Sequence, residues 1–240
     1  GPAGNLYSNV IDLSKFLSCL FHDGKFDKGA MLKAESLGQM MTPIKDGDGK
    51  PQGFGLGFHV QDLDGYTKIG HGGAIYGFST QLEALPEQKL GVAAVSALDG
   101  TNGVVQRLAD YALRLMIATQ DGEPLPDYPR TGPIPLERAR DLIGKYREVD
   151  GTQLTSITEL NSDVFMQQGS YRYELRAAVD DGSITVDSEF GFGTKVTLKD
   201  NGITVGGKDF ERLPDTPPAD IPDRWRGLIG EYGWDHNTLY

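Results

Sequence analysis

The sequence has few of the features that fix a covalent framework or a membrane attachment. Only one cysteine, Cys19, occurs among its 240 residues, so no internal disulfide can form. Cys19 lies within an apolar helical pattern, which predicts a small buried side chain rather than a nucleophile. No apolar run approaches the roughly 18 residues of a membrane-spanning helix. We therefore expect no membrane span in this chain, and the residues alone leave its localisation open.

Positive charge is also scarce. The chain has 23 Lys and Arg against 34 Asp and Glu, a formal net charge of -11. Nucleic acids and anionic membranes bind cationic surfaces, so this balance argues against both as partners. The four histidines are scattered, and none pairs with Cys, Asp or Glu at metal-ligand spacing. Asp46-Gly47-Asp48-Gly49 lacks the later ligands of a calcium loop. The sequence thus predicts no metal and no cofactor.

The usual signatures of a serine nucleophile are missing as well. A serine needs an adjacent base at neutral pH, yet no serine here is followed three residues later by lysine, and no Gly-x-Ser-x-Gly elbow occurs. Tyr7-Ser8-Asn9 spells Tyr-x-Asn, which supplies a base in some serine hydrolases. Because it leads directly into a helix start, we interpret it as a chance match.

The first half of the chain alternates between helical and strand-like patterns. Apolar residues at helical spacing predict a helix over residues 8–21, capped by Ser8 or Asn9, and a shorter one over 34–41. Residues 104–117 restore the helical period. Between them, turn signals such as Asp64-Gly65 separate strand-like runs and predict an antiparallel meander with the last helix packed on one face. The expected strands are 53–60, 66–70, 78–85 and 90–98, the last of them covered on both faces.

The second half has a different texture. Residues 119–135 are rich in proline and predict a linker between domains. Residues 136–213 show short alternating strands, which predict a small barrel or sandwich of roughly eight strands. A second proline-rich stretch opens the segment 214–240, where Arg138–Tyr146 recurs as Arg224–Tyr232 with six of nine positions identical. We expect that segment to be a linker and the truncated start of a second, similar β unit.

The stretch around which the chain is organised is Tyr66–Ser79. Gly72 and Gly73 clear space beside the backbone, and His71 places a polar group next to it. Enzymes present backbone N–H donors and a side chain to a substrate in this way. A plain glycine-rich hairpin with a surface histidine is the alternative, and these residues alone leave both open.

Several segments in order resemble one family. Pro2–Ser8 followed by Asp12–Leu17 is similar to the "AGGLYST…DLARFL" segment of serine β-lactamase-related hydrolases, which include class C β-lactamases, DD-peptidases, D-aminopeptidases and family VIII esterases. Gly55–Phe58, Gly70–Gly73 and Gly77-Phe78 match the segments that follow. The resemblance covers about residues 2–118. Residues 136–213 resemble, more weakly, the lipocalin-like barrels appended to many of these hydrolases.

This resemblance implies an α+β fold, with residues 1–118 as the C-terminal part of a transpeptidase-like domain followed by a small all-β barrel. It places His71 at the family's third motif, near the substrate carboxylate and the catalytic hydroxyls, with Gly72 and Gly73 lining the site and the Ala74 N–H as an oxyanion donor. The Ser-x-x-Lys and Tyr-x-Asn motifs of the family lie upstream of this region. We therefore expect a fragment that is inactive alone, whose partner is the missing N-terminal part of the same domain, in the same or another chain.

The family also implies acyl transfer on a β-lactam, a D-amino-acid peptide or an ester, and a periplasmic or secreted location. An uncovered apolar sheet face leads us to expect poor stability or homo-oligomers. The alternative function is a non-catalytic accessory protein that holds a small molecule or peptide in its barrel.

Overall fold

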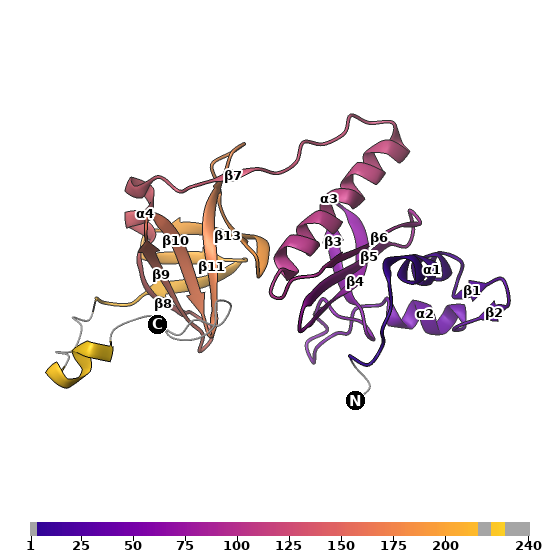
Figure 1. The fold of residues 1–240 in the computed structure, drawn as a ribbon, viewed down its shortest axis with the longest axis horizontal. Coiled ribbons are helices and arrows are strands. Elements are labelled where there is room, and N and C mark those ends of the chain that lie inside the picture. Colours follow the sequence, from indigo (N-terminus) through magenta and orange to yellow (C-terminus); the bar gives the residue numbers. More distant parts are fainter. Residues whose placement is uncertain (1–3, 216–221, 229–240) are drawn as a thin grey trace. The chain divides into compact units, whose positions relative to one another are not determined.

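The computed structural model describes residues 4–215 and 222–228 of the chain (Figure 1). The chain divides into two compact units between Tyr128 and Pro129. No helix among the described residues is long and apolar enough to cross a membrane. Residues 229–240, which hold part of the second repeat copy and of the expected truncated unit, lie outside the described residues. The start of that copy lies in a 3-10 helix, η1 (Asp223–Leu228).

The first unit is a four-stranded antiparallel sheet with helices on both faces, as Figure 1 shows. The strands lie in chain order, and each neighbouring pair is joined by a hairpin, as the sequence predicts. The elements are α1 (Val10–Phe21), β1 (Lys25–Phe26), β2 (Gly29–Ala30), α2 (Ala34–Met40), β3 (His59–Leu63), β4 (Tyr66–Ile75), β5 (Phe78–Leu85), β6 (Leu90–Ser96) and α3 (Asn102–Asp121).

Alternating residues of the strands send apolar side chains to opposite faces of this sheet. On one face, Leu17 of α1 and Leu37 of α2 pack with Ile69 of β4. On the other, Leu113 of α3 packs with Leu63 and Leu85. The predicted meander with a helix returning across it is therefore confirmed. Asn9 caps α1 through its side chain, which accepts a hydrogen bond from the Asp12 N–H at 3.0 Å.

Two predicted strands have different bounds. The run 53–60 is a strand only from His59, because Gly53 and Gly57 have φ of 70° and 83°, outside the extended region. The strand predicted over 66–70 continues to Ile75, so the glycines after His71 are part of the ladder with β5.

The strand predicted over 90–98 was expected to be covered on both faces. Helices α1 and α3, on opposite faces of the sheet, both contact it as expected. The strand is half-buried, lies at the edge of the sheet and ends at Ser96, two residues short of the predicted end. Val95 is 44% exposed. The small apolar residues of β6 pack closely against two helices, since β6 contacts both α1 and α3. They do not indicate a central position in the sheet.

The proline-rich stretch 119–135 contains the boundary between the two units, and regular elements extend into both of its ends. Helix α3 continues to Asp121 and ends at Gly122, whose φ is 71°. The Tyr111 hydroxyl then donates to the Pro126 carbonyl at 3.0 Å. Residues 131–132 form a short strand, β7, that pairs with β11 of the second unit.

The second unit is a closed antiparallel barrel of eight strands. Each strand pairs with the next along the chain, and β15 pairs back with β8. The elements are β7 (Thr131–Gly132), α4 (Leu136–Leu142), β8 (Gly144–Glu148), β9 (Leu154–Leu160), β10 (Asp163–Gln168), β11 (Tyr171–Ala178), β12 (Ile184–Ser188), β13 (Gly191–Lys199), β14 (Gly202–Val205) and β15 (Lys208–Arg212).

The barrel core is filled by the chain's own side chains. Tyr146, Met166 and Phe210 are among the buried residues from its strands, and Leu142 of α4 packs against them. The first repeat copy spans the end of α4 and the start of β8, and the Tyr146 hydroxyl donates to the Leu142 carbonyl at 2.6 Å. The predicted small β unit of about eight strands is thus a barrel rather than a sandwich.

Candidate functional site

The four residues singled out by the sequence lie consecutively on β4. His71, Gly72, Gly73 and Ala74 pair in order with Leu82, Gln81, Thr80 and Ser79 of β5. On the other side of β4, the ladder with β3 stops at the pair His59–Gly70. From His71 onward, β4 therefore has a strand on one side only.

The direction of the backbone groups follows from the hairpin. Only two residues, Tyr76 and Gly77, join β4 to β5, so the flanking Ile75 and Phe78 form a hydrogen-bonded pair. The pattern alternates from there, so Gly73 bonds to β5, whereas Gly72 and Ala74 point their N–H groups the other way. Among the described residues, nothing accepts a hydrogen bond from these two N–H groups. These two N–H groups lie along an open edge of β4, where each residue advances about 3.3 Å along the strand.

The imidazole of His71 lies beside this edge. Its Nδ1 is 2.5 Å from the Gly72 carbonyl oxygen. A carbonyl oxygen can only accept, so Nδ1 carries a proton and donates it, and in the neutral ring the lone pair is then on Nε2. The ring is exposed, with the ring of His59 at a centroid distance of 5.3 Å.

The loop before α3 and the first residue of that helix form hydrogen bonds with the β4–β5 hairpin. The Asn102 side-chain amide donates to the Gly73 carbonyl at 3.0 Å, and the Gly77 N–H donates to the Asp99 carboxylate at 2.5 Å. The Thr101 N–H donates to the Ser79 hydroxyl at 3.1 Å. Sequence reasoning missed these residues, because nothing local in residues 98–102 reveals that they meet β4.

The glycines of β4 are required by close contacts. A Cβ on Gly73 would lie 2.6 Å from the Thr80 hydroxyl oxygen, and one on Gly70 would lie 2.4 Å from the Leu82 carbonyl oxygen. Real Cβ atoms do not approach so closely. At Gly70 the neighbour is backbone, so a larger residue would force the strands apart, whereas at Gly73 the Thr80 side chain would have to move. The glycine-rich sequence therefore has a packing role as well as an open edge.

A buried charged cluster lies under α3, on the same sheet. Lys68 of β4 donates to Glu83 of β5 at 2.9 Å and also binds Asp110 of α3. Burial raises the pKa of Glu83 to about 7, Lys68 opposes this rise and Asp110 adds to it. The second Glu83 carboxylate oxygen has no hydrogen-bond partner. Sequence reasoning did not single out this cluster.

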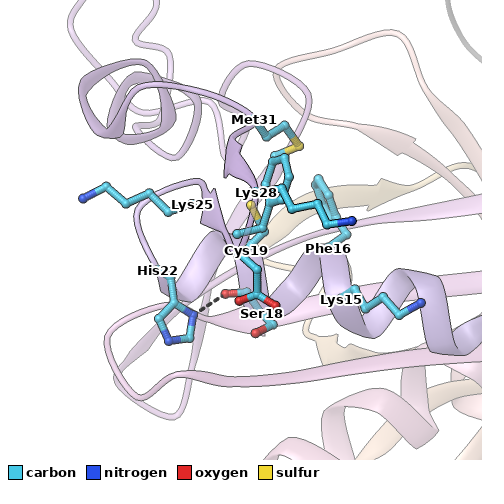
Figure 2. A pocket seen from close by; sticks show the side chains of 10 residues that line it. Lys15, Phe16, Ser18, Cys19, His22, Lys25, Lys28 and Met31 are labelled. Carbon is cyan, nitrogen blue, oxygen red and sulfur yellow. Dashed lines mark hydrogen bonds between the residues drawn. The ribbon is translucent and has the colours of Figure 1, made fainter.

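A separate hollow of about 1010 Å³ opens beside α1, as Figure 2 shows. Its apolar lining includes Phe16, and its basic lining includes Lys25 and Lys28. Cys19 lies in its wall but is only 7% exposed, which confirms the prediction of a small buried side chain. His22 Nδ1 bonds to the Ser18 carbonyl at 2.7 Å. The hollow contains none of the β4 residues.

Comparison with known proteins identifies the first unit. A family model described as Beta-lactamase matches residues 1–116, which include α1 to β6, the open strand edge and most of α3. Residues 1–116 belong to the serine β-lactamase-related family. The resemblance inferred from the sequence is thereby confirmed for the β-lactamase-family domain.

Three solved structures are similar to the chain at low identity. The octameric penicillin-binding protein homologue from Pyrococcus abyssi has 20% identity and a TM-score of 0.42, over 85% of this chain and 46% of its own. SurE with D-Leu has 22% identity and a TM-score of 0.31, over 76% and 44%. A further structure of SurE has 19% identity and a TM-score of 0.36, over 86% and 48%. The chain spans less than half the length of each structure, and no curated protein matches it.

Among the described residues, no group of three or more His, Cys, Asp or Glu side chains is arranged to hold a metal ion. At the open edge, β4 offers two backbone N–H donors and the His71 imidazole. Two N–H groups on an open edge can bind an extended acyl or peptide backbone, and one of them can stabilise a developing oxyanion. A neutral imidazole with a free Nε2 can accept a proton or a hydrogen bond.

Proposed function

We propose that residues 1–116 are the C-terminal part of a serine hydrolase that transfers acyl groups through a serine acyl-enzyme. The observation that carries this proposal is the open edge of β4, where the N–H groups of Gly72 and Ala74 lie beside the His71 imidazole. The membership of this part of the chain in the serine β-lactamase-related family supports it.

In this proposal, the Ala74 N–H is one donor of the oxyanion hole and the Gly72 N–H binds the substrate backbone by strand addition. His71 faces the substrate carboxylate and the catalytic hydroxyls. Gly73 leaves room for the Thr80 hydroxyl, which would lie 2.6 Å from a Cβ at this position. The substrate is a β-lactam, a D-amino-acid peptide or an ester.

The nucleophile comes from elsewhere. The printed sequence holds no Ser-x-x-Lys, so we propose that a preceding segment of the parent protein supplies the serine and its lysine base. The exposed apolar tip of the β4–β5 hairpin supports a partner there: Ile75 is 59% exposed, Tyr76 93% and Phe78 49%. Such a cluster favours coverage by another part of the protein. Association between copies of the chain is a further proposal for the same surface.

The barrel is lipocalin-like in this proposal, with a supporting rather than catalytic role. Its core is packed with side chains such as Tyr146, Met166 and Phe210. Small eight-stranded barrels can be filled in this way or can hold one small ligand. The filled core favours the hydrolase over the alternative of an accessory protein that binds a ligand inside the barrel.

Covalent labelling tests the proposal. A fluorescent penicillin and an activated ester are incubated with the 240-residue chain and with a longer parent protein, and adducts are located by mass spectrometry. We expect no adduct on the 240-residue chain, and an adduct on the serine of a Ser-x-x-Lys motif in the parent. An acyl adduct on the 240-residue chain alone would refute the assignment of the nucleophile. A parent gene without that motif would refute the hydrolase.

A further inference from the structure

Two histidines meet at the end of the β3–β4 ladder. His59 is the first residue of β3 and pairs with Gly70, so His71 is the next residue along β4. The two imidazoles have a centroid distance of 5.3 Å and an interplanar angle of 40°. The Phe54 ring contacts His59 edge-on at 4.6 Å. The sequence prediction of no metal site rested on the spacing of the histidines along the chain. That spacing does not show that the hairpin brings His59 close to His71.

Both rings have a nitrogen that is available to bind a metal ion. In the neutral His71 ring, the bond from Nδ1 to the Gly72 carbonyl favours the tautomer whose lone pair is on Nε2. Metal-binding histidines in proteins commonly donate their other ring N–H to a carbonyl or carboxylate. Among the described residues, the His59 ring makes no hydrogen bond.

The spacing of the rings agrees with one ion held between them. With Zn–N bonds of about 2.0–2.1 Å, the centre of each imidazole lies about 3.2 Å from the metal, and two rings at a tetrahedral angle have centres about 5.2 Å apart. The observed centroid distance is 5.3 Å. An edge-on aromatic neighbour, Phe54, limits how far the His59 ring can turn away.

We propose that His59 and His71 form a two-histidine site for a divalent transition-metal ion such as Zn²⁺. His71 contributes Nε2, and His59 contributes one of its ring nitrogens. Because the described residues offer no third ligand of the His, Cys, Asp or Glu type here, water or an external carboxylate completes the coordination. The site shares His71 with the acyl-transfer proposal, but its test does not depend on that proposal, since equilibrium binding needs no nucleophile.

The test is a titration of the full chain with ZnCl₂, followed by calorimetry and by ¹H–¹⁵N spectra of the imidazole nitrogens. We expect shifts of the His59 and His71 ring nitrogens on binding. His59→Ala and His71→Ala should each weaken the affinity at least about tenfold, because each removes one of only two protein ligands. Circular dichroism checks that each variant is folded.

His22→Ala is the matched control. The His22 ring also bonds a backbone carbonyl through Nδ1, at 2.7 Å, but it lies at the end of α1 in the separate hollow. We expect its removal to leave the affinity unchanged. The proposal is overturned if the wild-type spectra show no shift at His59 and His71, or if His22→Ala abolishes binding while His59→Ala does not.

Discussion

Lys68 of β4 donates a hydrogen bond to Glu83 of β5 at 2.9 Å in the interior of the β-lactamase-family domain, where their side chains are 5% and 1% exposed. Asp110 of α3 binds the same ammonium group. One cation thus lies between a buried carboxyl group, Glu83, and a partly buried one, Asp110. Such a cluster joins the sheet that carries the candidate site to the helix that covers it.

Lys68→Met should destabilise this domain strongly. The substitution leaves Glu83 buried, and Asp110 partly buried, without their cation, and breaking a buried pair in this way costs about 3–5 kcal/mol. Urea denaturation of the full chain measures the free energy of unfolding. Lys15→Met is the control, because Lys15 and Asp12 form an ion pair that is 73% and 55% exposed, and we expect a change of about 1 kcal/mol or less. Equal effects of the two substitutions would contradict the buried cluster.

Glu83 should also make the stability depend on pH. Its pKa is raised from 4.5 to about 7 in the folded protein, first by burial. The folded state therefore holds the Glu83 proton more tightly than the unfolded state, so this contribution is full below about pH 4.5 and is lost as the pH rises through about 7. The loss amounts to about 3 kcal/mol at most.

Glu83→Gln removes that titration, so its free energy of unfolding should fall less than that of the wild type between about pH 4.5 and 7. Urea denaturation across this range measures the difference. Glu87→Gln, at the exposed turn after β5, should follow the wild type. Parallel curves for Glu83→Gln and the wild type would show that the buried carboxyl group does not titrate in this range.

The two units should unfold separately. A Cβ on Gly70 would lie 2.4 Å from the Leu82 carbonyl oxygen in the first unit, and one on Gly202 would lie 2.0 Å from the Phe210 carbonyl oxygen in the barrel. Gly70→Ala and Gly202→Ala should each cost about 1–3 kcal/mol through overpacking. Hydrogen exchange measured by mass spectrometry should show faster exchange only in the unit that carries the substitution. Faster exchange in both units for either variant would indicate a single cooperative unit.

Much of the fold could be predicted from local patterns, but its pairwise contacts could not. Asp64-Gly65 forms the β3–β4 turn, in which the two residues have φ of 54° and 92°. This type of turn can be predicted from the sequence, because Asp-Gly is one of its preferred residue pairs. The start of β3 was misplaced because Gly55 and its neighbours pack against the chain near Met40 rather than pairing as a strand.

The same holds for the candidate site: some of its residues could be predicted from the sequence, but the contacts between them could not. His71 and its glycines stand out in the sequence, because consecutive glycines beside one histidine are unusual in a strand. The meeting of His59 with His71 depends on the register of a hairpin, and the bond from Asn102 to Gly73 joins residues 29 apart. No local pattern encodes such pairs.

Ala74→Pro in the parent enzyme isolates the oxyanion donor. The Ala74 N–H points to the open edge, where proline is tolerated because no ladder bond is lost. We expect a folded protein with turnover lowered about 10²- to 10³-fold, since one oxyanion donor is removed. Gly73→Pro is the contrast, because the Gly73 N–H bonds to β5, so we expect unfolding. Full activity of Ala74→Pro would rule out that N–H as a donor.

Turnover of the parent enzyme with His71→Ala tests the central claim, that the open edge of β4 with its histidine lines an acyl-transfer site. Hydrolysis of a chromogenic cephalosporin and of a p-nitrophenyl ester is measured for the wild type, His71→Ala and the control His22→Ala, with the melting temperature of each. We predict that His71→Ala lowers turnover about 10²-fold with the fold intact, because a preorganised polar group is lost at a developing charge, and that His22→Ala matches the wild type. Equal rates for His71→Ala and the wild type on whichever substrate the enzyme turns over would contradict the account.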